Sequence, residues 1–126
     1  MKKNIKKKSR IVENGRIYIV ATFNNTLITI TDEKGQPIVV GSTGMYGFSG
    51  TRKSTPYAAT TTVEATIKKA INNYGLTKAN IFVKGIGPGR EAALRAIKNS
   101  DLDVEKIVDI TPIPHNGVRP PKLRRV

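Results

Sequence analysis

The sequence contains no cysteine and only one histidine, and these two shortages exclude several classes of site. Without cysteine the chain forms no disulfide, carries no thiolate chemistry and offers no cysteine ligand to zinc. The single histidine, His115, has no plausible partner for a metal site or a catalytic triad, so we expect its ring to hydrogen-bond or stack. We therefore predict that the protein uses no metal ion and no cofactor.

Long apolar runs are also absent. No stretch approaches the roughly 18 apolar residues that a transmembrane helix requires. The basic start of the chain invites comparison with a secretion signal, but Glu13, Asn14 and Arg16 interrupt the place where the apolar part of such a signal would lie. These patterns predict a soluble intracellular protein with no membrane partner, and the lack of cysteine fits a reducing compartment.

Acidic residues are few, and the resulting positive charge is concentrated at the two ends of the chain. The 126 residues include 22 Lys and Arg but only nine Asp and Glu, for a formal net charge of +13. Residues 1–10 hold six basic residues and residues 115–126 hold four, with no acid in either segment. Such blocks of like charge repel themselves and commonly bind nucleic acid. We predict a basic N-terminal arm over residues 1–10, one globular domain over 11–111, and an extended tail rich in proline and arginine over 112–126.

The first part of the domain has the pattern of three short strands. Residues 16–23, 27–32 and 38–42 are rich in β-branched and aromatic residues and are separated by short polar turns. Short connections of this kind favour an antiparallel meander. After the third strand we predict a long loop over residues 43–56.

Two helices and two further strands are predicted beyond this loop. Thr55 and Pro56 are typical of an N-cap and a first helical position, and Gly75 is typical of the residue after a helix end. The remaining elements are a strand over 80–86, a helix over 88–99 and a strand over 104–110.

This order of elements predicts the fold class. Strand–helix–strand units form right-handed crossovers with parallel pairing. The order β-β-β-α-β-α-β therefore predicts an α/β fold, with a five-stranded mixed sheet, flanking helices and extended basic N- and C-terminal arms. The layout resembles the ribonuclease-H-like motif.

The fold class raises the possibility of a metal-dependent nuclease, which the carboxylates do not support. Such an enzyme holds two cations about 4 Å apart with several clustered carboxylates. The predicted strands 16–23 and 80–86 contain none. Glu64 is isolated on its helix, where we expect it to be solvated, and Asp109 ends the last strand without evident partners. We predict that the protein is not an enzyme.

Two loops that lead into helices have the composition of phosphate-binding segments. In "KGIGPGRE" (84–91), the helix amides and Arg90 favour an anion, although the motif matches neither a P-loop nor a dinucleotide-binding fingerprint. The alternative is a glycine-rich turn that packs the helix against the strand. "GTRKSTP" (50–56) places Arg52 and Lys53 before the other helix, and its alternative is an exposed polar loop. In "MYGF" (45–48), two aromatic rings suit base stacking, but a packing role is favoured.

The C-terminal tail cannot supply its own backbone partners. Pro112, Pro114, Pro120 and Pro121 remove amide donors and favour an extended path. An extended cationic chain is free to follow a polyanion, and release of counterions from phosphates can offset the cost of ordering it. The tail therefore predicts a nucleic-acid partner.

Several of these motifs together resemble a known family. "FNNTLITITD", "GFSGTRKSTPYAA", "KGIGPGREAALRA" and "DITPIPHNGVRPPKLRRV" are similar to small-subunit ribosomal protein eleven of bacteria and organelles, over about residues 11–126. The resemblance implies a structural constituent of the small ribosomal subunit, without nuclease activity. It would bind and bridge ribosomal RNA helices on the platform and help to form the cleft where messenger RNA pairs with ribosomal RNA (the Shine–Dalgarno cleft).

The same resemblance implies partners, location and RNA-facing positions. The partners are small-subunit ribosomal RNA and neighbouring platform proteins, with messenger RNA and initiation factor three nearby. The location is the cytoplasmic ribosome, or the matrix or stroma of an organelle. The implied RNA-facing residues are Asn24, Asn25, Thr26, Arg52, Lys53, Ser54, Thr55, Lys84, Gly85, Gly87, Gly89, Arg90, His115, Asn116, Gly117, Arg119, Lys122, Arg124 and Arg125. Two other functions stay open: a free nucleic-acid condenser, and a phosphate-handling enzyme that uses residues 84–91.

Overall fold

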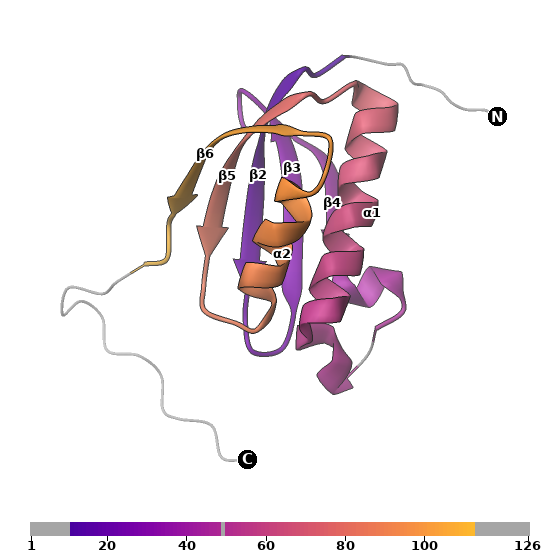
Figure 1. The fold of residues 1–126 in the computed structure, drawn as a ribbon, viewed down its shortest axis with the longest axis vertical. Coiled ribbons are helices and arrows are strands. Elements are labelled where there is room, and N and C mark those ends of the chain that lie inside the picture. Colours follow the sequence, from indigo (N-terminus) through magenta and orange to yellow (C-terminus); the bar gives the residue numbers. More distant parts are fainter. Residues whose placement is uncertain (1–10, 49, 113–126) are drawn as a thin grey trace.

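The protein folds as one five-stranded sheet with two α-helices packed on a single face (Figure 1). The computed structural model describes residues 11–48 and 50–112. In chain order the elements are β2 (Asn14–Ala21), β3 (Thr26–Asp32), β4 (Pro37–Ser42), the short 3-10 helices η1 (Thr43–Tyr46) and η2 (Gly50–Ser54), α1 (Pro56–Tyr74), β5 (Lys78–Lys84), α2 (Gly89–Lys98) and β6 (Asp103–Asp109).

The sheet is mixed, as the sequence predicts. Its strand order is β4-β3-β2-β5-β6, with antiparallel pairing of β3 to both β2 and β4, and parallel pairing of β5 to both β2 and β6. Because β3 alone runs in the opposite direction, the strands β2, β4, β5 and β6 all end at the same edge of the sheet. The loops that follow these strands therefore meet at one end of the molecule.

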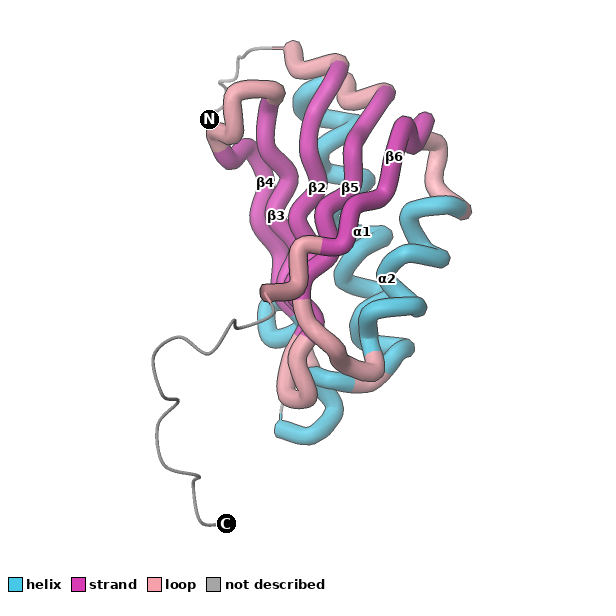
Figure 2. Tube along the Cα trace, turned by 90° about the vertical axis from the view of Figure 1, so that its left-hand side faces the viewer, coloured by secondary structure: helices cyan, strands magenta, loops and turns pink. Residues whose placement is uncertain are grey.

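The core lies between the sheet and the two helices. Residues alternate along each strand, so that Ile17, Ile19 and Ile81 are completely buried while their neighbours are partly exposed. The helices contribute Val63 and Ile67 from α1, and smaller residues such as Ala93 from α2, to the same cluster. Burying each large aliphatic side chain contributes about 1.5–3 kcal/mol, which makes this interface the main stabilising element. Figure 2 shows the sheet from its edge, with both helices on one side of it.

Local signals in the sequence explain where α1 begins and ends. Thr55 Oγ1 accepts a hydrogen bond from the amide of Ala58 at 3.2 Å, and Pro56 occupies the start of the helix. Gly75 adopts the left-handed conformation with φ of 70° and donates its amide to the carbonyl of Ile71. Both predicted helix boundaries are confirmed.

Some predicted boundaries are wrong, for identifiable reasons. β2 and β5 each begin and end two residues before the predicted ranges 16–23 and 80–86, because the Thr22 turn and Gly85, with φ of 94°, end them. The segment 43–56, predicted as a loop, contains η1 and η2. Gly47, with φ of 89°, closes η1 by directing its amide to the carbonyl of Thr43.

In residues 11–48 and 50–112, no helix combines the length and the hydrophobicity needed to cross a bilayer. The predicted arm over 1–10 and the tail after residue 112 lie outside the described part of the chain.

Candidate nucleic-acid interface

Three segments that the sequence singles out meet at the sheet edge where β2, β4, β5 and β6 end. We call this edge the loop edge; it comprises residues 22–26, 43–48, 50–55, 84–90 and 109–112. Both helices also begin here, after Thr55 and Pro88, so their amino-terminal amides face the same side. In Figure 1 most of the loop edge lies at the lower end of the molecule, whereas residues 109–112, after β6, lie on its left side, where the described chain ends.

The β2–β3 turn is fixed by its own side chains. Thr22 Oγ1 accepts hydrogen bonds from the amides of Asn24, at 3.2 Å, and Asn25, at 3.0 Å. The side-chain oxygen of Asn25 accepts from the amide of Thr26 at 2.8 Å and from Thr43 Oγ1, which ties the turn to η1. Thr26 is completely buried, whereas Asn24 is exposed. Of these three predicted RNA-facing residues, Asn24 presents its side chain to solvent, while Asn25 and Thr26 hold the turn in place.

The segment before α1 combines exposed cations with a capped helix start. Arg52 is exposed and Lys53 is half-buried, both within η2. Thr55 Oγ1 donates to the carbonyl of Arg52 at 2.9 Å as well as capping α1. Thr55 thus fixes η2 relative to the helix. The side chain of Ser54 lies outside the described atoms.

The glycines of residues 84–90 allow close packing against the β2–β3 turn of the same chain. A Cβ at Gly85 would overlap the carbonyl oxygen of Ala21, and one at Gly87 would overlap that of Thr22. A Cβ at Gly89 would overlap the hydroxyl of the buried Thr26. These glycines therefore have a packing role within the chain, and phosphate binding by this loop stays a prediction. The exposed Lys84 stands at its start.

Arg90 joins this loop to the end of β6. Its guanidinium donates to the carbonyl of Gly85 and to the carboxylate of Asp109, both at 2.9 Å. Asp109 Oδ1 also accepts from Thr111, through the hydroxyl at 2.6 Å and the amide at 3.0 Å. The expectation that Asp109 has no partner is wrong, because the sequence does not reveal that the end of β6 lies beside the start of α2.

These contacts stabilise the ionised form of Asp109. The two hydrogen bonds from Thr111, followed by the one from Arg90, lower the pKa of Asp109 from 3.8 to about 2. Thr111 Oγ1 accepts in turn from the amide of Gly85 at 3.0 Å. The resulting network of Gly85, Arg90, Asp109 and Thr111, which we call the tail anchor, holds the point from which the C-terminal tail departs.

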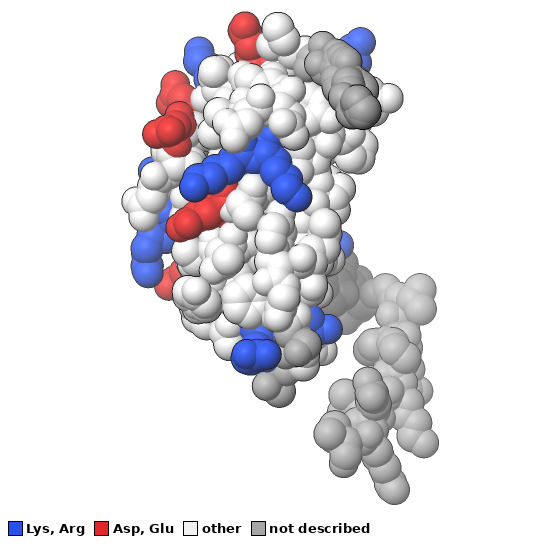
Figure 3. All heavy atoms as spheres, turned by 90° about the vertical axis from the view of Figure 1, so that its right-hand side faces the viewer, with Lys and Arg blue, Asp and Glu red and all other residues white. Residues whose placement is uncertain are grey.

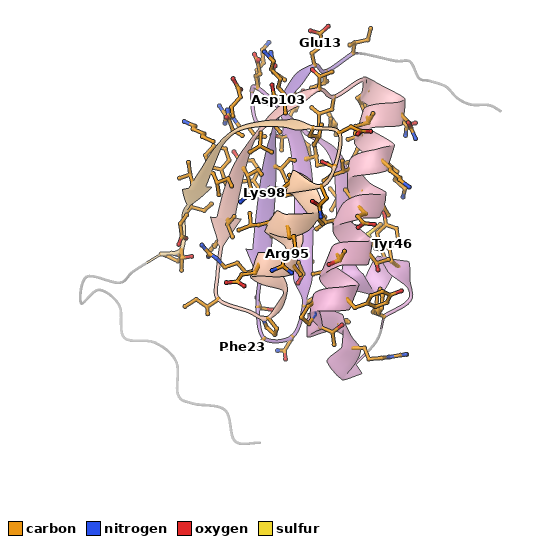
Figure 4. The ribbon with its side chains drawn as sticks, viewed as in Figure 1. Glu13, Phe23, Tyr46, Arg95, Lys98 and Asp103 are labelled. Carbon is orange, nitrogen blue, oxygen red and sulfur yellow. The ribbon has the colours of Figure 1, made fainter. Side chains whose placement is uncertain are left out.

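Exposed apolar side chains at the loop edge were missed by reasoning from the sequence. Phe23 and Ile86 expose 74% and 72% of their surfaces, and Tyr57, at the start of α1, exposes 72%. Figure 4 shows Phe23 at the lower end of the ribbon. The signal in the sequence was the position of Phe23 in a turn and of Ile86 between two glycines, where neither side chain can reach the core.

The aromatic rings of "MYGF" pack within the protein, as favoured from the sequence. Phe48 meets Tyr57 edge to face, with ring centroids 5.9 Å apart. Lys69 Nζ lies 5.4 Å from the ring centroid of Tyr46. These contacts hold η1 and its following residues against α1.

Charge is segregated between the two edges of the sheet. The loop edge carries four basic residues and one acidic residue, with a second acid next to it in the sequence. The basic residues are Arg52, Lys53, Lys84 and Arg90; the acids are Asp109 and the neighbouring Glu91. The opposite edge, which we call the far edge, carries most of the acids. Its charged residues are Glu13, Asp32, Glu33, Lys34, Lys78, Asp101 and Asp103. Figure 4 shows Glu13 and Asp103 at the upper end. Figure 3 shows acidic and basic atoms side by side in the upper and middle parts of the face over α1, and basic atoms alone at its lower end.

The described carboxylates do not form a catalytic cluster. Within residues 11–48 and 50–112, no three His, Asp or Glu side chains lie close enough together to hold a metal ion. Glu64 is exposed on α1, as predicted. The remaining predicted RNA-facing residues lie outside the described part of the chain; they are His115, Asn116, Gly117, Arg119, Lys122, Arg124 and Arg125.

Comparison with known proteins gives consistent matches over almost the whole chain. The family model of Ribosomal protein S11 matches residues 15–125. Small ribosomal subunit protein uS11 of Coprothermobacter proteolyticus is 53% identical over 121 residues, which cover 96% of this chain and 96% of that protein.

Proposed function

Because the chain belongs to the ribosomal protein S11 family, we propose that it is a structural RNA-binding component of the small ribosomal subunit, with its loop edge turned toward ribosomal RNA. The observation that carries this orientation is the convergence of three loops, two helix starts and the root of the basic tail on one cationic edge. Helix amino termini carry a partial positive charge, which adds to that of the side chains. The acids collect at the far edge, which a polyanion would avoid.

The loop edge is suited to binding the RNA backbone. Arg52, Lys53 and Lys84 would contact phosphates, and Asn24 would hydrogen-bond to ribose or phosphate. Arg90 engages Gly85 and Asp109, so its role is to fix the loop and the tail anchor. Such a surface recognises the shape of folded RNA more than the edges of its bases. Phe23 and Ile86 lie where unpaired bases can stack or pack on them.

The C-terminal arm extends this surface beyond the globular domain, whereas the basic segment 1–10 joins the domain at residue 11, at the far edge. Residues 1–10 and 115–126 together hold ten of the 22 basic residues and no acid. The tail anchor holds Asp109 and Thr111 at the loop edge, so we propose that the C-terminal arm, which begins there, binds RNA beside the same surface. We assign to the arms the bridging of RNA helices on the platform, beside the cleft where messenger RNA pairs, with platform proteins and initiation factor three nearby. This proposed function is structural and involves no catalysis.

The test compares binding to a platform fragment of ribosomal RNA with binding to random duplex DNA, across a range of salt concentrations. With roughly 6–10 phosphate contacts, the logarithm of the duplex affinity falls against the logarithm of salt with a slope of about −5 to −9. The folded RNA fragment binds more tightly than the duplex at every salt concentration. Equal affinities would instead identify a general nucleic-acid condenser.

A further inference from the structure

One face of the sheet has no layer over it among the described residues. Both helices pack on the other face (Figure 2). β2, β5 and β6 are parallel neighbours, and sheets made only of parallel strands are almost always covered on both faces, whereas antiparallel pairs such as β2–β3 tolerate one exposed face. We call this uncovered surface the open face.

The register of the strands places an apolar row across the open face. Tyr18 of β2 pairs with Thr29 of β3 and with Phe82 of β5. Thr29 pairs in turn with Val40 of β4, and Phe82 with Val108 of β6. One row thus crosses all five strands, and Val40 at its end exposes 52% of its surface. The next row adds Val20 and Leu27, the latter 42% exposed.

The charges beside this row have one sign. Lys84 lies in the row of Val20 and Leu27, and Arg16 and Lys106 lie in the row on the other side. These three rows contain no carboxylate. The nearest acids are Asp103, opposite Lys78 in a more distant row, and Glu105, at the bulge of the edge strand β6. A complementary occupant would carry apolar side chains flanked by carboxylates.

The geometry of the aromatic pair favours protein over RNA as the occupant. The rings of Tyr18 and Phe82 stack on each other, with centroids 5.1 Å apart and planes 17° apart. Each ring therefore has one of its two faces covered by the other ring, which reduces the ring surface on which a base could stack. The other apolar side chains of this surface are aliphatic, so they provide no aromatic ring on which a base could stack. Aliphatic burial is the usual way in which a helix packs on a sheet.

We propose that the open face is the docking site of an amphipathic segment from a neighbouring ribosomal protein. Its apolar stripe would lie along the row from Val40 to Val108, and its carboxylates would meet Arg16 and Lys106. The segment would complete a third layer over the parallel strands. This inference rests on the proposed function for its setting, the assembled small subunit, but it uses none of the RNA-facing residues.

The experiment places the photoreactive analogue benzoylphenylalanine at Val40 of the full chain, within assembled small subunits. Val40 is half-exposed on an edge strand, so the bulkier side chain is compatible with folding. The expected product is a cross-link to another ribosomal protein, at a segment with alternating or helically spaced apolar residues and adjacent carboxylates. A cross-link to RNA or to a second copy of the chain, or no cross-link at all, would overturn the proposal.

Tyr57, in the first turn of α1 beside the loop edge, is the matched position for the same analogue, and there the expected product is a cross-link to RNA. If the analogue at position 57 forms no cross-link to RNA while the analogue at position 40 cross-links to a protein, the proposed orientation of the loop edge is contradicted and the docking site is supported. If the analogue at position 57 cross-links to RNA but the analogue at position 40 does not cross-link to a protein, only the docking site is contradicted.

A charge reversal tests the electrostatic part of the proposal. Lys106→Glu should lower the occupancy of the cross-linked neighbour in small subunits by roughly fivefold, as expected for loss of a surface ion pair. Lys68→Glu makes the same change on α1, away from the open face, and should leave that occupancy unchanged. Quantitative mass spectrometry of purified subunits measures both, and equal effects from the two variants would contradict the assigned charge complementarity.

Discussion

At the scale of single residues, the tail anchor depends on Asp109 being ionised. Thr111 and Arg90 hold the pKa of Asp109 at about 2, below its ordinary value of 3.8. A carboxylate with a lowered pKa in the folded state stabilises the protein fully above about pH 4, and this contribution is lost as the pH falls toward 2. The tail anchor is therefore intact at neutral pH.

Thr111→Val removes the hydroxyl that makes the largest contribution to this shift. The pKa of Asp109 should then rise from about 2 toward 3.8, as measured by the carboxyl chemical shift of Asp109 during an acid titration. Thr77→Val removes a hydroxyl that donates to the carbonyl of Glu13 at the far edge, and it should leave the titration of Asp109 unchanged. An unaltered pKa in Thr111→Val would show that Thr111 does not anchor Asp109.

Gly87 is required because its backbone lies against the carbonyl of Thr22. Gly87→Ala forces a methyl group into that carbonyl and should lower the free energy of unfolding by about 1–3 kcal/mol. Gly44→Ala is the matched control, because its nearest neighbours would be 3.9 Å from the new methyl group. Urea unfolding measures both variants, and equal stability of the two would contradict the close packing of the loop against the turn.

At the scale of elements, α1 depends on its capped first turn, which also positions η2. Thr55→Ala removes the side-chain acceptor for the amide of Ala58 and should cost about 1 kcal/mol of stability. Thr60→Ala, one turn further on, removes only a bond to the carbonyl of Pro56 and should cost little or nothing. Thermal unfolding of the two variants measures the difference, and equal losses would show that the cap is not important.

The α-helices and strands were predictable from the sequence because each has a local cause. Alternating β-branched residues mark β2 and β3, and Thr55, Pro56 and Gly75 mark the ends of α1. The 3-10 helices were not predicted, since four or five residues are too few to show a period. The pairing of Arg90 with Asp109 depends on the crossover that brings α2 beside β6, and no local pattern reveals it. The glycines at 85, 87 and 89 indicate a close approach, but only the fold shows that the neighbour is the β2–β3 turn.

At the scale of the whole molecule, stability should reside in the globular domain, whereas RNA binding should depend on the two arms as well as on the loop edge. The core lies between the sheet and the helices, whereas ten of the 22 basic residues lie in 1–10 and 115–126. Deleting residues 115–126 should leave thermal unfolding nearly unchanged but weaken binding to the ribosomal RNA fragment severely. A large loss of thermal stability would show that the tail packs on its own domain.

The orientation of the protein can be measured directly, because a chain without cysteine accepts one introduced cysteine as a unique attachment point. Asn24→Cys at the loop edge and Lys34→Cys at the far edge are both at exposed positions, and each can carry a tethered iron chelate that cleaves nearby RNA. In assembled small subunits, cleavage of ribosomal RNA is expected to be stronger from position 24 than from position 34. Cleavage that is equal from the two positions, or stronger from position 34, would contradict the account.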